Sequence, residues 1–195
     1  MKPTRDDVGG LATFRLVADI LIRPLVAGDA DAVRRVVGAA FHPGNEADFV
    51  ERIRASDQYV AAMELVAVDG GEIIGHLMGS GTSISDHTGD TSTISMLSPL
   101  AVSPERQRQG IGGTLVRAVS EIADRFGEPL IVLEGDPTYY SRLGFAPAAT
   151  AGISMPLPDW APPEAAQVLC LSSYDQRDVR LRGRVTYPPS FDGFS

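Results

Sequence analysis

The chain has 195 residues, of which 44% are hydrophobic and 22% are charged, and this composition is ordinary for one sizeable globular domain. Its formal net charge of −8, from 25 acidic and 17 basic residues, argues against nonspecific nucleic-acid binding, which needs a basic surface. No apolar run approaches the roughly 18 residues that span a bilayer, and the first residues lack the apolar core of a signal peptide, so we expect a cytoplasmic protein with no membrane partner.

The first part of the chain predicts one strand followed by two helices. Residues 19–24 indicate a strand that breaks before Gly28. Asp29 is a residue type suited to cap a helix over residues 30–41, where apolar side chains recur at helical spacing. A second helix is expected over residues 46–56, beginning after the Gly44-Asn45 pair.

The middle of the chain predicts an antiparallel hairpin and a further strand. Two apolar stretches within residues 58–85 are joined at Asp69-Gly70-Gly71, which is a strong hairpin signal. The next strand, "TSTISMLSPLAVSP", contains Pro99. Because proline removes a ladder hydrogen bond, we expect a bulge or a splayed edge at that point.

The second half predicts a β-α-β unit and a short helix. The glycine-rich step is followed by an amphipathic helix that ends at Gly127 and by a buried strand, "PLIVLEGD". "TYYSRLGF" indicates a short helix that stops at Gly144, residues 166–171 indicate a strand, and residues 183–192 are expected to be an extended segment on the surface.

The element order is therefore β-α-α-β-β-β-α-β-α-β, which predicts a mixed α/β fold. We expect residues 1–18 to be an N-terminal extension and residues 19–195 to form a single domain, because no change in composition marks a second one.

The stretch "SPERQRQGIGGTLVRAV" has the features of an anion site. A strand that enters a glycine-rich turn opening a helix leaves free backbone N–H groups at the positive end of the helix dipole. Arg106 and Arg108 offer charge-assisted contacts at the rim. The alternative is a glycine-rich helix start with exposed arginines. No lysine follows the glycines as a Walker A loop requires, and the spacing G-x-G-G differs from the dinucleotide fingerprint.

The pattern Q-x-x-G-x-G, from Gln107 to Gly112 and preceded by "LAVSPE", resembles the acetyl-CoA motif of the GNAT N-acetyltransferase superfamily. "YYSRLGF" is similar to the Y-x-x-x-G-F signature of that family, with Tyr140 in the tyrosine position. "GDPTYYSRLGF" and "GRVTYPPSFD" more narrowly resemble the predicted acetyltransferases grouped with the bacterial YhbS protein. The resemblance covers roughly residues 20–192 and implies a GNAT-like, centrally splayed β-sheet flanked by helices.

The resemblance implies acetyl-CoA as co-substrate, without a metal. The loop cradles the coenzyme A pyrophosphate in that family, and free backbone groups of the splayed strand bind the pantetheine arm and polarise the thioester carbonyl. Carried over to this chain, the cofactor-binding residues are expected to be Leu100, Ala101, Val102, Gln107, Arg108, Gln109, Gly110, Ile111, Gly112, Gly113 and Thr114.

Two catalytic roles follow from the chemistry of acetyl transfer. The leaving thiolate needs a proton, which a phenol can supply, and the matching position gives that role to Tyr140, with adjacent Tyr139 expected to pack. The attacking ammonium must lose a proton, and Glu134 at the end of its strand is the candidate base, since removal from water would raise its pKa. A packed tyrosine and a solvated glutamate are the alternatives. His76 and His87 are weaker candidates for the base.

The acceptor is expected to be a small-molecule or peptide amine, and the protein a monomer or homodimer. The resemblance suggests that His42, Glu46, residues 87–92 and the segment "PLPDWAPPEAA" lie near this acceptor. Asp136 replaces an asparagine that many relatives carry, which weakens the analogy.

Direct transfer through a ternary complex is expected, because the only cysteine, Cys170, lies in an apolar strand and is predicted to be a core residue. That single cysteine also excludes an internal disulfide and a cysteine-cluster metal site. The alternative function is a noncatalytic acyl-CoA-binding sensor or interaction module.

Overall fold

The computed structural model describes residues 15–17 and 19–192 of the chain. Ten strands form one sheet: β1 Arg15–Val17, β2 Ile20–Pro24, β3 Tyr59–Asp69, β4 Glu72–Ser85, β5 Thr91–Val102, β6 Leu130–Glu134, β7 Ala146–Pro147, β8 Ile153–Ser154, β9 Ala166–Cys170 and β10 Gly183–Thr186. The α-helices are α1 Ala30–Ala40, α2 Glu46–Arg54, α3 Ile111–Phe126 and α4 Pro137–Tyr140. Within this described part, no helix has the length and apolarity to cross a membrane.

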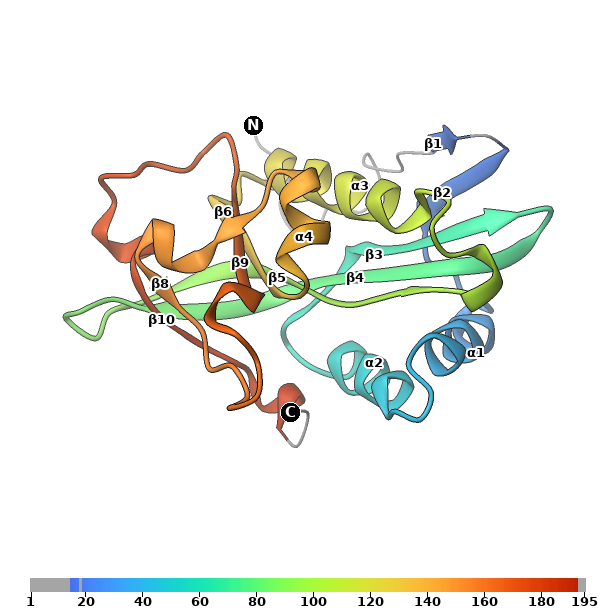
Figure 1. Ribbon diagram of the computed structural model, residues 1–195, viewed down its shortest axis with the longest axis horizontal. Coiled ribbons are helices and arrows are strands. Elements are labelled where there is room, and N and C mark those ends of the chain that lie inside the picture. Colours follow the sequence, from blue (N-terminus) through green and yellow to red (C-terminus); the bar gives the residue numbers. More distant parts are fainter. Residues whose placement is uncertain (1–14, 18, 193–195) are drawn as a thin grey trace.

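The sheet is mostly antiparallel, with the order β1-β2-β3-β4-β5-β6-β9-β7. Helix α3 covers one face, and α1 and α2 cover the other (Figure 1). Strands β5 and β6 are parallel and are joined through α3, so the predicted β-α-β unit is confirmed. The β3–β4 turn is also as predicted, with Gly70 and Gly71 at φ values of 55° and 89°.

The sheet splits in its middle, between β5 and β6. These strands pair only at Ser95 with Ile131 and at Met96 with Val132. Beyond this point β5 bulges, because Leu77 and Gly79 of β4 lie opposite Leu100 and Leu97, which leaves Ser98 and Pro99 facing the single residue Met78. The bulge expected at Pro99 and the centrally splayed sheet are therefore confirmed.

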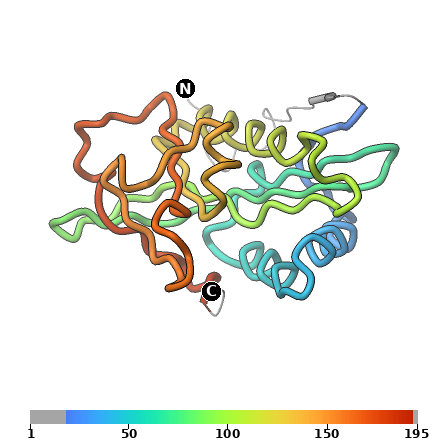
Figure 2. Tube along the Cα trace, viewed as in Figure 1, coloured from blue at the N-terminus to red at the C-terminus, as the bar shows by residue number. Residues whose placement is uncertain are grey.

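The C-terminal tail differs from the expectation of a surface segment. Strand β10 pairs with β4 and β8, and Val185, opposite Ile84, is fully buried. The chain then returns to α2, where the Phe191 ring packs edge-on against Phe49 with 4.6 Å between ring centroids. Figure 2 shows this end of the chain beside α2. The prediction was wrong because the tail fills an edge of β4 that β3 leaves open.

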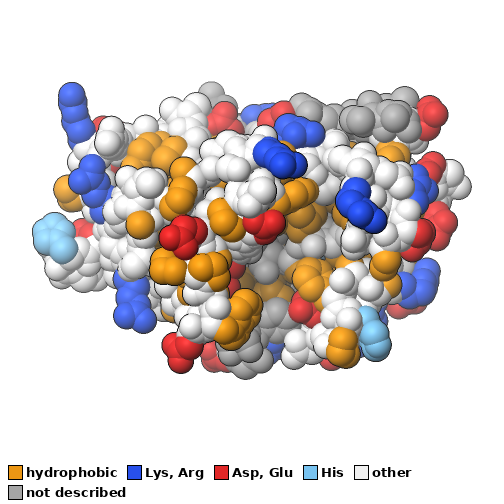
Figure 3. All heavy atoms as spheres, in the orientation of Figure 1, with side chains coloured by type: hydrophobic (Ala, Val, Ile, Leu, Met, Phe, Trp, Pro, Cys, Tyr) orange, Lys and Arg blue, Asp and Glu red, His pale blue; other side chains and the backbone are white. Residues whose placement is uncertain are grey.

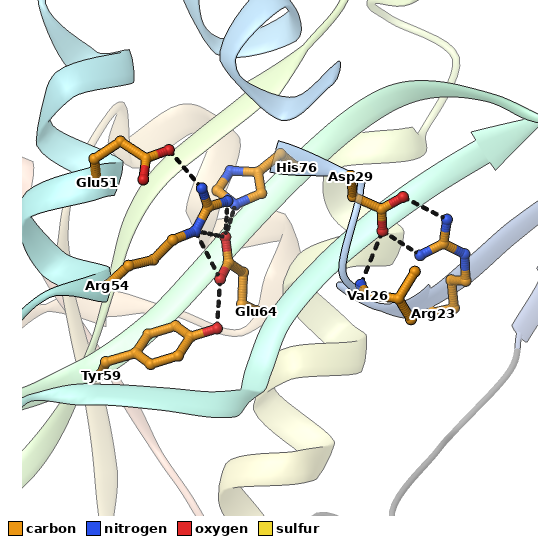
Figure 4. A network of polar contacts seen from close by, with 8 residues as sticks. All are labelled: Arg23, Val26, Asp29, Glu51, Arg54, Tyr59, Glu64 and His76. Carbon is orange, nitrogen blue, oxygen red and sulfur yellow. Dashed lines mark hydrogen bonds and ion pairs between the residues drawn. The ribbon is translucent and has the colours of Figure 1, made fainter. Parts of the chain in front are cut away.

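Residues 15–17 of the predicted N-terminal extension pair with β2 as β1, and the rest of that extension lies outside the described residues. Asp29 does precede α1, but its carboxylate does not cap the helix. It accepts hydrogen bonds from Arg23 Nη1 at 2.6 Å and from the Val26 N–H at 2.9 Å (Figure 4). The ion pair with Arg23 ties the start of α1 to β2 and lowers the pKa of Asp29.

A buried polar network lies between the sheet and α2 (Figure 4). Glu64 of β3 is inaccessible to solvent and accepts hydrogen bonds from Arg54 Nε at 2.9 Å and from the Tyr59 hydroxyl at 2.7 Å. His76 of β4, also inaccessible, places Nε2 at 2.9 Å from Glu64 Oε1. Because an ionised carboxylate only accepts, Nε2 carries a proton. Burial lowers the pKa of His76, and its Nδ1 has no hydrogen-bond partner among the described residues, so the ring is neutral. His76, considered above as a base, is therefore part of the core.

We expect this network to make the protein sensitive to acid. Burial alone would raise the pKa of Glu64, but the bonds from His76 and Arg54 outweigh it and lower the pKa from 4.5 to about 2. A depressed folded-state pKa gives stability that is present above pH 4.5 and is lost as the pH falls toward 2. Burial lowers the pKa of His76, so its contribution is likewise lost below about pH 6.5.

The measurement is urea unfolding of the wild type and Glu64→Gln at pH 5 and pH 3. Over this range Glu64 becomes protonated in the unfolded protein but stays ionised in the folded one, which should remove about 2 kcal/mol from the free energy of unfolding of the wild type. Glu64→Gln should lack this component and be less stable at pH 7, because it leaves the Arg54 charge without its carboxylate. Parallel pH profiles for the two proteins would contradict the assignment.

Candidate active site

A cavity of about 480 Å³ opens on the α3 face of the sheet, where β5 diverges from β6. We call it the loop cavity. It is lined by Leu100, Val102, Arg106, Gln107, Arg108, Gly110, Ile111, Gly112, Gly113, Arg117, Tyr139, Arg142 and Leu143.

The loop before α3 turns its backbone toward this cavity. Arg108 and Gly110 both adopt left-handed backbone conformations, with φ values of 61° and 84°, and α3 begins at the next residue. The first N–H groups of a helix have no intrahelical acceptor, and such a turn gathers them into a site for anions. A Cβ placed at Gly112 would lie 2.7 Å from the Tyr139 hydroxyl oxygen. The space in front of Gly112 therefore depends on the absence of a side chain.

Most of the predicted cofactor-binding residues line the loop cavity, and three do not. Ala101 is buried in the core on the α1–α2 face. Gln109 is exposed and donates from Nε2 to the Glu105 carbonyl at 3.3 Å. The Thr114 hydroxyl donates to the Gly110 carbonyl at 3.1 Å, which closes the first turn of α3. Gln109 and Thr114 therefore support the loop rather than the cavity wall, and Ala101 belongs to the core.

Arg106 lies at the rim, where it was expected, and four further lining residues were not predicted for this site: Arg117, Tyr139, Arg142 and Leu143. Arg106 is held by an ion pair with Asp69 at 2.6 Å. Arg117 lies one helical turn after Gly113, and this i,i+4 spacing was a signal that could have identified it. Arg142 reaches the cavity through tertiary packing alone. Together the arginines give the rim a positive field suited to an anionic ligand.

The two neighbouring tyrosines take different positions. Tyr139 lines the loop cavity and is 37% exposed, in contrast to the packing role expected for it. Tyr140 is half-buried and lines neither this cavity nor the second one described below, and its ring lies edge-on to the rings of Tyr139 and Phe145 at centroid distances of 4.9 and 5.6 Å. Its ring also lies against Gly135, since a Cβ there would come within 2.2 Å of it. Burial raises the pKa of Tyr140, so the phenol is protonated at neutral pH.

A second cavity, of about 610 Å³, lies on the opposite face of the same split. We call it the aromatic cavity. It is lined by Phe41, Glu46, Phe49, Met96, Ser98, Glu134, Gly135, Asp136, Pro137, Trp160, Ala161, Pro162, Ala165, Tyr187 and Phe191. Strand β5 lines both cavities, and α4 contributes Tyr139 to the loop cavity and Pro137 to the aromatic cavity. The two cavities therefore meet where β5 diverges from β6.

Glu134 stands in the aromatic cavity, at the end of β6. The Tyr187 hydroxyl donates a hydrogen bond to Glu134 Oε1, a contact that the sequence analysis missed. Partial removal of water raises the pKa of Glu134, and the bond from Tyr187 opposes that rise. A carboxylate whose pKa moves toward neutrality suits proton transfer. Tyr187 comes from the tail, whose folding onto β4 had no local signal.

Of the other residues expected near the acceptor, some line the aromatic cavity and some do not. Glu46 lines the aromatic cavity, as does part of the segment "PLPDWAPPEAA", including Trp160. His42 is exposed and does not line it, and neither do residues 87–92, at the β4–β5 turn. Among the described residues there is no group of three or more His, Cys, Asp or Glu side chains placed to hold a metal ion.

The expectation of a buried Cys170 is wrong. This residue ends β9, and its side chain is exposed. The pKa of the thiol is raised by partial shielding from water, which disfavours the thiolate that a nucleophile needs. Cys170 lines neither the loop cavity nor the aromatic cavity.

Comparisons with known proteins agree with this geometry. Residues 21–148 match the family model for the acetyltransferase (GNAT) domain. The chain is 31% identical over 158 residues to the uncharacterized N-acetyltransferase YjhQ of Escherichia coli, across 80% of this chain and 86% of that protein. The crystal structure of the N-acetyltransferase YhbS of Escherichia coli in complex with CoA superposes with a TM-score of 0.80 at 28% identity, covering 92% of this chain and 95% of that one. A GNAT family acetyltransferase from Brucella melitensis in complex with acetyl-CoA gives 0.66 at 30% identity, covering 89% and 98%.

Proposed function

This chain belongs to the GNAT acetyltransferase family, and from that premise we propose that it binds acetyl-CoA and transfers the acetyl group directly to an amine in a ternary complex. The observation that carries the proposal is the arrangement of two cavities on opposite faces of one split in the sheet. One has an arginine-rimmed glycine loop, and the other has a carboxylate on aromatic walls.

The loop cavity fits the diphosphate of coenzyme A. Backbone N–H groups from Arg108 to Gly113 would hold the phosphate oxygens, and Arg117 and Arg142 would add charge-assisted contacts. The bulge at Ser98–Pro99 leaves the end of β5 unpaired with β6, so backbone groups near Leu100 are available for an extended pantetheine arm. Two structures similar to this one contain CoA or acetyl-CoA.

The chemistry assigns a role to each side of the split. The amine nitrogen attacks the thioester carbonyl carbon, the C–S bond breaks, and the sulfur leaves with its electron pair. Glu134 accepts a proton from the ammonium, and Tyr187 orients its carboxylate. Tyr140 donates a proton to the leaving sulfur, for which its protonated phenol is suited. No covalent acetyl-enzyme is formed.

Calorimetric titration of the purified protein with acetyl-CoA, and with free CoA in parallel, tests the first part of the proposal. We expect saturable binding of both, with a Kd on the order of 1–100 μM. Release of CoA in the presence of amines then tests transfer. Absence of binding by a folded protein would contradict the proposal. Binding without transfer to any amine would favour the alternative of a noncatalytic acyl-CoA sensor.

A further inference from the structure

The walls of the aromatic cavity combine aromatic rings with carboxylates. Five aromatic side chains and three carboxylates line it, and none of the described lining residues is a lysine or an arginine. Figure 3 shows hydrophobic and acidic side chains around the hollow in the middle of this face. The loop cavity, across the split, has arginines instead. The two cavities therefore select ligands of opposite charge.

Glu46 contributes a carboxylate that has no ion-pair partner among the described residues. It is the first residue of α2, and its Oε2 is buried with no hydrogen-bond partner among the described residues. The carboxylate lies over Gly44, since a Cβ there would fall 2.0 Å from Oε2. A buried carboxylate oxygen without a donor is costly, and the positive charge of an ammonium group in the cavity would reduce that cost through space, without direct contact.

The other two carboxylates face the cavity from the end of β6 and the start of α4. Asp136 accepts from the Thr138 N–H at 2.8 Å, which fixes its side chain at the start of α4. Glu134 accepts from the Tyr187 hydroxyl. An ionised carboxylate has about four acceptor positions, so Glu134 retains the capacity to accept from an ammonium as well.

The aromatic rings give the cavity an apolar body. The Phe191 ring contacts Phe49 on one side and the Tyr187 ring on the other, at centroid distances of 4.6 and 5.4 Å. Trp160, 81% exposed, stands at the rim. Aromatic faces attract both apolar groups and cations, and the attraction for cations increases when water is removed.

We propose that the acceptor is a small cationic amine with an aromatic or other apolar body and with no carboxylate or phosphate. This inference rests on the proposed function, because it names the substrate class of the same site. A negative charge on the acceptor would meet the carboxylates of Glu46, Glu134 and Asp136, and the described wall offers no cation to pair with it. Amino acids and acidic peptides are thereby excluded as acceptors, whereas amines derived from amino acids by decarboxylation or by amidation of the carboxylate fit the site.

Four amines that differ in the aromatic ring and in the charge of a branch test the inference. Phenethylamine carries the cation and the ring, and L-phenylalaninamide adds a neutral branch. L-phenylalanine replaces that branch with a carboxylate, and ethanolamine lacks the ring. We expect kcat/KM for the first two to exceed that for the last two by at least about 10-fold. Equal rates for L-phenylalanine and its amide, or faster acetylation of ethanolamine, would overturn the inference.

A charge variant tests the role of Glu46 directly. Glu46→Gln should raise KM for phenethylamine by about 10-fold and leave the Kd of acetyl-CoA unchanged. The ratio of kcat/KM for phenethylamine to that for L-phenylalanine should decrease. Asp48→Asn is the matched control, because Asp48 lies two residues further along α2 and outside the cavity, where it pairs with Arg34. If both variants behave alike, the unpaired carboxylate of Glu46 does not select the acceptor.

A binding measurement separates failure of this inference from failure of the proposed function. Trp160 is the only tryptophan of the chain, so its fluorescence reports occupation of the aromatic cavity. Phenethylamine and L-phenylalanine are each titrated with and without saturating CoA. Phenethylamine should give a saturable change in fluorescence, and L-phenylalanine should not. If this selectivity appears but no acetyl group is transferred, the proposed function fails and the ligand class stands. If the protein transfers the acetyl group, but neither the fluorescence titration nor the kcat/KM values distinguish phenethylamine from L-phenylalanine, the proposed ligand class fails.

Discussion

Replacing Tyr140 by phenylalanine is expected to lower kcat by about 100-fold or more and to leave the Kd of acetyl-CoA unchanged. The change removes one hydroxyl from a half-buried ring packed between Tyr139 and Phe145, so the ring contacts remain. Loss of a general acid typically costs 100-fold to 10,000-fold, and about 100-fold corresponds to about 2.7 kcal/mol of transition-state stabilisation. Single-turnover rates, with calorimetry for cofactor affinity, measure the two effects separately.

The neighbouring tyrosine supplies the matched control. The Tyr139 hydroxyl lies in the loop cavity beside Gly112. Tyr139→Phe is therefore expected to raise KM for acetyl-CoA with little change in kcat. The opposite result, in which Tyr139→Phe lowers kcat and Tyr140→Phe does not, would move the acid to Tyr139. If neither variant lowers kcat, protonation of the leaving group comes from water or from another residue.

Replacing Gly112 by tryptophan is expected to weaken acetyl-CoA binding by more than about 100-fold, which is about 3 kcal/mol. A Cβ at this position would already lie 2.7 Å from the Tyr139 hydroxyl and 3.5 Å from the Leu100 side chain, so an indole fills the loop cavity. It also covers the N–H groups at the start of α3. Calorimetry measures the affinity, and circular dichroism with thermal unfolding confirms that the variant is folded.

The control for this substitution is Gly38→Trp in α1. Gly38 is also a helical glycine, but a Cβ there has no atom within 4 Å, and α1 covers the opposite face of the sheet. We expect this variant to bind acetyl-CoA as the wild type does. Equal affinity of the Gly112→Trp variant and the control would remove the diphosphate from the loop cavity.

Much of the fold could be predicted because local chemistry specifies it. Gly70 and Gly71 adopt the positive φ values that a tight hairpin needs, and Gly127 ends α3 in a left-handed conformation. The bulge at Pro99 follows from the missing N–H of proline. In each of these places the residue type restricts the backbone directly, so a short stretch of sequence contains the whole explanation.

The rest depends on partners that are distant along the chain. The tail becomes strand β10 because Val185 pairs with Ile84, about one hundred residues earlier. Asp29 does not cap α1 because Arg23, on a different element, competes for its carboxylate. The site shows the same division. The glycine loop was predictable from a few consecutive residues, whereas the contact of Tyr187 with Glu134 requires the complete sheet.

The split in the sheet separates two tasks in the sequence as well as in space. Most of the lining of the loop cavity comes from one stretch of the chain, from Leu100 to Arg117. The aromatic cavity is assembled from five separate segments around Phe41, Met96, Glu134, Trp160 and Tyr187. Variation in any one of these segments alters the wall around the amine and leaves the diphosphate loop intact. The architecture therefore allows acceptor preference to diverge among related chains while the use of a common acetyl donor persists.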